Sequence, residues 1–109
     1  MGYTGAAGRR GETMARDEQI TRCSICGREP VGEDYPRRVC PRCDALALND
    51  AGRPPLVAPD GSAGDNPVFI EGRQCWREYA RGGWATMLDA DNCRDYREFC
   101  RRNGLPDPP

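Results

Sequence analysis

The chain has 109 residues, a formal net charge of −1 and an isoelectric point near 5.5. All 16 basic residues are arginine and there is no histidine, which excludes Ser–His and Cys–His catalysis and every metal site that needs an imidazole. The slightly acidic balance also argues against coating nucleic acid by bulk electrostatics, so any such contact would need a local arginine patch.

Residues 1–20 contain Gly, Arg, Glu and Ala with almost no large apolar side chains. Such a segment buries too little to offset the entropy of ordering, and we expect a disordered tail. The sequence has no stretch with the apolar length of a membrane span or of a signal peptide. We therefore expect a cytoplasmic protein with no membrane contact.

Residues 21–49 carry two Cys-x-x-Cys pairs separated by thirteen residues. A two-residue gap lets one tight turn present two thiolates to the same ion, and two such turns complete a tetrahedral shell. The sequence predicts one structural zinc ion with four ligands: Cys23, Cys26, Cys40 and Cys43. With every position filled by a thiolate, this zinc would hold the fold and would not activate water.

The alternatives for these cysteines are buried free thiols or redox pairs. A redox Cys-x-x-Cys normally lies at a strand-to-helix junction of a thioredoxin-like sheet. No such sheet is indicated around residues 20–48, so we favour zinc.

The first pair with Gly27, the short region with Tyr35 and Val39, and a second pair that opens a helical stretch over Asp44–Asn49 resemble a treble-clef zinc finger. The ligand spacing is similar to that of the first finger of nuclear hormone receptors, and the resemblance covers about residues 21–49. It implies a hairpin between the two pairs and a helix that carries the second pair. Treble clefs bind DNA, RNA or proteins, so function must be argued from surface residues.

Residues 50–67 are rich in Pro, Gly, Asp and Asn, and we predict a linker. Residues 68–105 then hold both Trp residues. Here 68–72 and 84–88 are predicted strands, whereas 74–79 is compatible with strand or helix. A three-stranded antiparallel β-meander is the favoured arrangement.

The last element is a helix from Asn92 to Asn103, capped by Asp89 or Asp91. Apolar residues at helical spacing form one stripe on it: Cys93, Tyr96, Phe99 and Cys100. Gly104 ends the helix, and Leu105 after it suits a Schellman motif. The predicted fold class is therefore small α+β: a treble-clef zinc module, a linker, a β-meander and a C-terminal helix.

The other three cysteines are Cys75, Cys93 and Cys100. On the predicted helix Cys93 and Cys100 lie about 10 Å apart, too far to share one metal ion. We interpret all three as core thiols, with a Cys75–Cys93 disulfide as the alternative.

Two arginine groups are candidate contact surfaces. Arg37, Arg38 and Arg42 flank the second cysteine pair, and their forked donors suit phosphate oxygens. The alternative is a solvated edge that compensates Glu33, Asp34 and the negative zinc–thiolate cluster.

The second group is Arg73, Arg77, Tyr79 and Arg81. In a strand these residues share one face and offer a platform for phosphate contacts and base stacking, and in a helix the three arginines still align. The alternative is a solvated face paired with nearby carboxylates.

No Gly-rich phosphate loop or recognisable pair of catalytic carboxylates is present, and we expect no enzymatic activity. The sequence favours a zinc-containing, non-catalytic interaction module that binds a protein. The alternatives are a zinc finger that binds nucleic acid and, third, a Cys-x-x-Cys redox protein.

Overall fold

The computed structural model describes residues 20–108. Its elements in chain order are α2 (Pro41–Asp44), β2 (Val68–Ile70), β3 (Arg73–Ala80), β4 (Gly83–Leu88) and α3 (Tyr96–Arg102). The predicted disordered tail, residues 1–20, lies outside the described residues except for Ile20.

The three strands form an antiparallel sheet in the order β2-β3-β4, which confirms the predicted meander. The segment that was compatible with strand or helix is therefore strand. Glu71 and Gly72 turn the chain between β2 and β3, both with positive φ. Gly82 and Gly83, also with positive φ, make the turn into β4, where glycine avoids the steric cost that a side chain would carry.

Residues near the cysteine pairs extend this sheet at both edges. Arg38 pairs with Met87 on β4, and Leu48 pairs with Phe69 on β2. The amide of Val39 donates to the carbonyl of Thr86 at 2.9 Å. The cysteine-bearing segment and the meander therefore share one hydrogen-bonded sheet.

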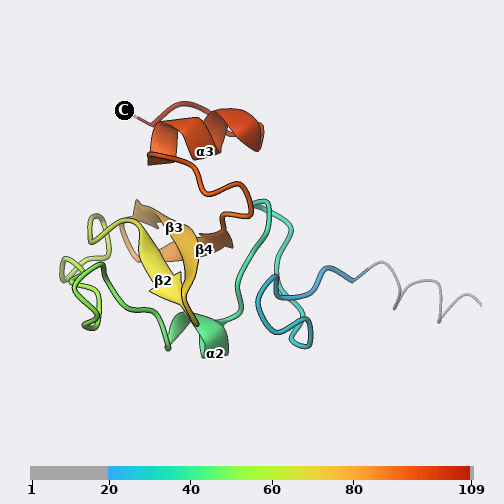
Figure 1. Cartoon of the computed structure of the whole chain (residues 1–109), viewed down its shortest axis with the longest axis horizontal. Coiled ribbons are helices and arrows are strands. Elements are labelled where there is room, and N and C mark those ends of the chain that lie inside the picture. Colours follow the sequence, from blue (N-terminus) through green and yellow to red (C-terminus); the bar gives the residue numbers. More distant parts are fainter. Residues whose placement is uncertain (1–19, 109) are drawn as a thin grey trace, which may run out of the picture.

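The two faces of the sheet pack against different parts of the chain, because successive strand side chains point to opposite faces. One face contributes to a metal-side cluster: Cys23, Val39, Cys40, Cys43, Ala47, Val68, Ile70, Cys75 and Leu88. The other contributes to a helix-side cluster: Trp76, Met87, Cys93 and Phe99. Figure 1 shows the sheet between α2 on one side and α3 on the other.

Helix α2 is a single turn, shorter than the resemblance implied. It ends at Asp44, so the helical stretch predicted over 44–49 is wrong. Leu48 instead exchanges two backbone hydrogen bonds with Phe69 of β2. Pairing with the sheet edge requires extended backbone, and this contact replaces the helix.

Helix α3 begins later than predicted. Its N-cap is Asp95, whose carboxylate accepts from the amide of Glu98 at 2.8 Å, and not Asp89 or Asp91. Asn92 has φ 54°, a left-handed conformation that cannot continue into a helix. The predicted ending is confirmed: the amide of Leu105 donates to the carbonyl of Cys100 at 2.8 Å after Gly104, as in a Schellman motif.

Residues 50–67 form a loop without helix or strand that is held against β3. The side chain of Asn66 accepts from the amide of Arg77 at 2.8 Å and donates to its carbonyl at 2.7 Å. The hydroxyl of Tyr79 donates to the carbonyl of Asp65 at 2.6 Å. The predicted linker therefore packs along β3.

Among residues 20–108, neither helix has the length and apolar content that a membrane span requires.

Candidate metal centre

The four cysteine thiols at the predicted zinc site converge on one point. Each sulfur lies within 4.8 Å of the other three, and the sulfurs of Cys26 and Cys40 are 4.0 Å apart. A tetrahedral ion with metal–sulfur bonds of about 2.3 Å would space its four sulfurs about 3.8 Å apart. The group can therefore close around one metal ion.

The first cysteine pair lies on a tight backbone turn. The amide of Cys23 donates to the carbonyl of Glu29 at 2.8 Å, and the amide of Gly27 donates back to the carbonyl of Cys23 at 2.9 Å. Gly27 has φ 69°, the left-handed conformation that this turn needs and that glycine adopts without strain. The turn thus presents both thiols on one side.

Backbone amides point at the sulfur atoms of this turn. The sulfur of Cys23 accepts from the amides of Ile25 at 3.3 Å and Cys40 at 3.2 Å. The sulfur of Cys26 accepts from the amide of Arg28 at 3.5 Å. Hydrogen bonds to a charged acceptor favour its charged form, so this arrangement suits thiolates.

Helix α2 presents the second pair. Cys40 is its N-cap residue and Cys43 lies within its single turn, closed by a hydrogen bond from the amide of Asp44 to the carbonyl of Cys40 at 2.9 Å. Pro41 occupies the first helical turn, where its missing amide costs nothing. One helical turn brings both sulfurs to the side that faces the first pair.

The thiols of the group differ in acidity. Burial raises the pKa of Cys23, but amide donors from Cys26, Cys40 and Ile25 outweigh it and lower the pKa to about 6. Burial raises the pKa of Cys43 to about 12, and hydrogen bonds with the neighbouring thiols add to this. A bound dication would favour the thiolate at every position.

Asp44, which no sequence motif marks as functional, joins this site to the sheet. Its carboxylate accepts from the guanidinium of Arg77 at 2.9 Å, the hydroxyl of Thr86 at 2.5 Å and the indole of Trp84 at 3.0 Å. These partners lie on β3 and β4, more than thirty residues away in the chain. No local sequence signal could have indicated the pairing.

The candidate contact surface on residues 73–81 has its central arginine buried in the structure. Arg77 is only 3% exposed and pairs with Asp44, while the Tyr79 hydroxyl is bound to Asp65. Arg73 is exposed on the same strand, and Arg81 lies beyond its end. Asp44 approaches this face of β3 and buries the central arginine, so Arg73, Arg77 and Arg81 do not form one exposed row.

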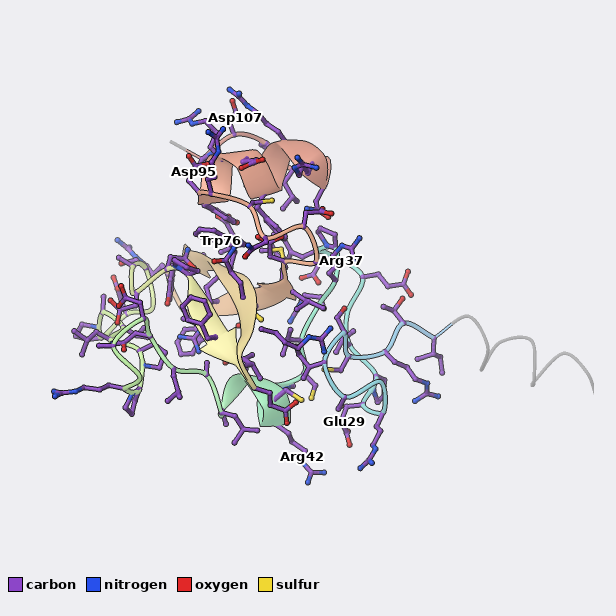
Figure 2. All side chains as sticks on the ribbon, viewed as in Figure 1. Glu29, Arg37, Arg42, Trp76, Asp95 and Asp107 are labelled. Carbon is purple, nitrogen blue, oxygen red and sulfur yellow. The ribbon has the colours of Figure 1, made fainter. Side chains whose placement is uncertain are left out.

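The arginines around the second cysteine pair point to separate partners. Arg38 pairs with Asp34 at 2.5 Å, and the Nε of Arg37 donates to Asn103 next to α3 at 3.3 Å. Arg42 is exposed and lies 3.7 Å from Glu29 at the outer rim of the site (Figure 2). They do not form one patch.

The remaining cysteines are buried and free of disulfide bonds. Cys75 and Cys93 belong to clusters on opposite faces of the sheet, so they do not pair. Burial raises the pKa of Cys75 to about 12 and that of Cys93 to about 11, as expected for core thiols.

A second group, Asp89, Asp91 and Cys93, also has its ligand atoms within 4.8 Å of one another. The Asp89 carboxylate, however, already accepts from Trp76, Gln74 and the amides of Asp91 and Cys93. These contacts order the turn before α3 and leave little capacity for a metal ion.

The fold and site define a small α+β protein with a four-cysteine group that can hold one metal ion. Comparisons of the chain with protein-family models, curated proteins and solved structures find no match.

Proposed function

We propose that the chain is a cytoplasmic, non-catalytic module that binds a protein partner and whose fold depends on one structural zinc ion. The observation that carries the proposal is the convergence of four thiols, three of them buried, at the wall of the metal-side cluster. An ion at this point would join the turn that carries the first cysteine pair to the helical turn that carries the second.

The chemistry of the donor set favours zinc. Four thiolates suit a soft ion of tetrahedral preference, and zinc with four cysteine ligands is a common structural site. The full sulfur shell leaves no position for water or substrate, which supports a structural role over catalysis. The absence of histidine from the chain agrees with a structural role for the metal.

We also propose that the site is of treble-clef type with a shortened helix. Support comes from the tight turn at Cys23–Cys26 and from the second pair on a helical turn. A treble clef would continue its helix after Asp44. In this chain the helix ends there, and Leu48 pairs with Phe69 at the edge of the sheet.

A protein partner is favoured over nucleic acid by the state of the arginines. Arg77 is buried in an ion pair, and Arg38 is paired with Asp34. Large apolar side chains meanwhile remain exposed: Leu46, Leu48, Leu56 and Trp84. Exposed apolar side chains are typical of surfaces that meet proteins, whereas phosphate binding needs unengaged cations.

Affinity capture with the zinc-loaded full chain from its native host tests this function. We expect one predominant protein that survives nuclease treatment and binds again in purified form with saturable stoichiometry. Retention of nuclease-sensitive material, or salt-sensitive binding to purified RNA or DNA without any protein partner, would contradict the proposal.

A further inference from the structure

The outer edge of β4 is only partly paired. The amide of Val39 donates to the carbonyl of Thr86, and the amide of Leu88 donates to the carbonyl of Arg37, each at 2.9 Å. The backbone groups of Thr86 and Leu88 therefore point away from β3. Because strand backbone groups alternate in direction, those of Trp84 point the same way, and no backbone group within residues 20–108 pairs with them.

The chain leaves this edge where α2 begins. After Val39 the backbone turns into Cys40 and Pro41, and proline has no amide with which to continue the pairing. A groove of about 260 Å³ opens at this point, lined by Val39, Pro41, Trp84 and Thr86 and by the charged side chains of Arg38 and Asp44. Unpaired backbone groups thus lie beside a largely apolar hollow.

Trp84 is held in place at this groove. It is 40% exposed, its indole donates to Asp44 at 3.0 Å, and the guanidinium carbon of Arg77 lies 4.8 Å from its ring centroid. A tryptophan that is exposed yet fixed in position loses little entropy on binding, which is typical of residues that dominate interfaces.

We propose that this edge binds an extended peptide segment of the protein partner by strand addition at Trp84, with an apolar side chain in the groove and a carboxylate near Arg81. The inference rests on the proposed protein-binding function and names its surface. Strand addition takes affinity from backbone hydrogen bonds and specificity from side-chain pockets.

The charges around Trp84 indicate the chemistry of the occupant. The Asp44 carboxylate already accepts from three donors, so the bound peptide needs no cationic side chain to compensate it. Arg81, beside a neighbouring groove that Trp84 also lines, is 89% exposed and 3.9 Å from Asp60. An arginine so weakly engaged favours an acidic residue on the peptide.

The length of the edge favours a peptide over a second copy of the chain. Val39 bounds the edge at one end. At the other end the loop at Gly61 packs so closely that a methyl group there would lie 2.8 Å from the nitrogen of Gly83. A stable dimer needs about 1,600 Å² of total buried area. Pairing of two copies along so short an edge would bury much less area than this.

Selection of twelve-residue peptides from a random phage-displayed library on the zinc-loaded full chain tests the proposal. We expect enriched peptides with alternating residues, an apolar residue among them and an acidic flank. In a titration of ¹⁵N-labelled protein, the amides of Gly83, Trp84 and Ala85 should shift most. Trp84→Ala should weaken binding about tenfold or more, whereas Leu56→Ala, at an exposed leucine outside the groove, should leave it unchanged.

N-methylation of the selected peptide provides a test that leaves the protein fold intact. Methylation of the amide that donates to the Trp84 carbonyl should lower affinity at least tenfold, and methylation one residue further along should have little effect. Enrichment of no peptide, shifts that map elsewhere, self-association at the edge, or equal effects of both methylations would overturn the edge inference. A captured protein partner that does not reduce the solvent exposure of Trp84 would also overturn the edge inference. The protein-binding proposal would then still stand.

Discussion

At the scale of single residues, Asp44 connects the metal site to the sheet. It follows Cys43 directly and forms an ion pair at 2.9 Å with Arg77, a nearly fully buried arginine whose Nε has no hydrogen-bond partner among the described residues. Removal of the carboxylate would leave a buried charge without compensation. Such a loss is far more costly than the loss of an exposed pair.

We expect Asp44→Ala to lower the free energy of unfolding of the zinc-loaded protein by about 3–5 kcal/mol, measured by urea denaturation. The matched control is Arg42→Ala, two residues earlier, because Arg42 is exposed and its pair with Glu29 spans 3.7 Å. That change should cost less than about 1 kcal/mol. Similar losses for the two variants would show that the buried pair contributes little.

Asp89 offers a second residue-scale prediction. Burial raises the pKa of its carboxyl, but donors from Trp76, Gln74 and the Cys93 amide outweigh this and lower it. Its stabilising contribution is therefore complete above the ordinary aspartate pKa of about 4 and is lost as the pH falls through the lowered value. At pH 7, Asp89→Asn should lower the free energy of unfolding by about 1–3 kcal/mol. Asparagine offers one acceptor oxygen to the donors that the two carboxylate oxygens of Asp89 satisfy, so part of these donors would be left without a partner.

The control for Asp89 is Asp91→Asn, an exposed carboxylate in the same turn. Its effect on urea denaturation at pH 7 should stay within about 0.5 kcal/mol. An Asp89→Asn variant as stable as this control would contradict the role of Asp89 in ordering the turn.

At the scale of elements, the sequence predicted those whose signals are local. The strands, the Gly104 ending of α3 and the cysteine turns depend on residue patterns within a few positions, and the structure has them. The helix boundaries that were predicted wrongly depend on distant contacts. Leu48 leaves a helical pattern because Phe69 of β2 is available as a backbone partner.

The start of α3 illustrates a choice between equivalent local signals. Asp89, Asp91 and Asp95 are all capable N-caps, and apolar spacing alone favoured a start at Asn92. The Asp89 carboxylate is instead taken up by Trp76 of β3, so Asp95 is left to cap the helix. This outcome depends on packing, which spacing cannot reveal.

Replacement of the observed cap should destabilise α3. We expect Asp95→Ala to lower the free energy of unfolding by about 1 kcal/mol in urea denaturation, because the amide of Glu98 loses its acceptor. Asp95→Ser should retain most of the stability, since serine is also a good N-cap. A loss from Asp91→Ala as large as that from Asp95→Ala would argue for the earlier start.

At the scale of the whole molecule, the four-cysteine site is continuous with the protein core. The metal-side cluster unites Cys23, Cys40 and Cys43 with Val68 and Ile70 of the meander. The four site cysteines were predictable because their spacing alone reflects the geometry of a tetrahedral ion. The burial of Arg77 could not be predicted from the sequence, because it depends on how the cysteine-bearing segment docks on the sheet.

This shared core implies that metal loss reaches beyond residues 21–49. Structural zinc contributes on the order of 10 kcal/mol to small fingers, comparable to the whole stability of a domain of this size. Without the ion, the two cysteine turns would separate and uncover Val68 and Ile70. We therefore expect the meander to lose its packing together with the cysteine turns.

The most direct test combines metal analysis with near-ultraviolet circular dichroism of the purified full chain. We predict one zinc ion per chain, and loss of the signal from Trp76 and Trp84 when a chelator removes it. Cys23→Ser should abolish zinc binding, whereas Cys93→Ser, outside the site, should retain one ion. A chain that contains no zinc or two zinc ions, or that keeps its tryptophan signal after chelation, would contradict a single zinc ion on which the fold depends.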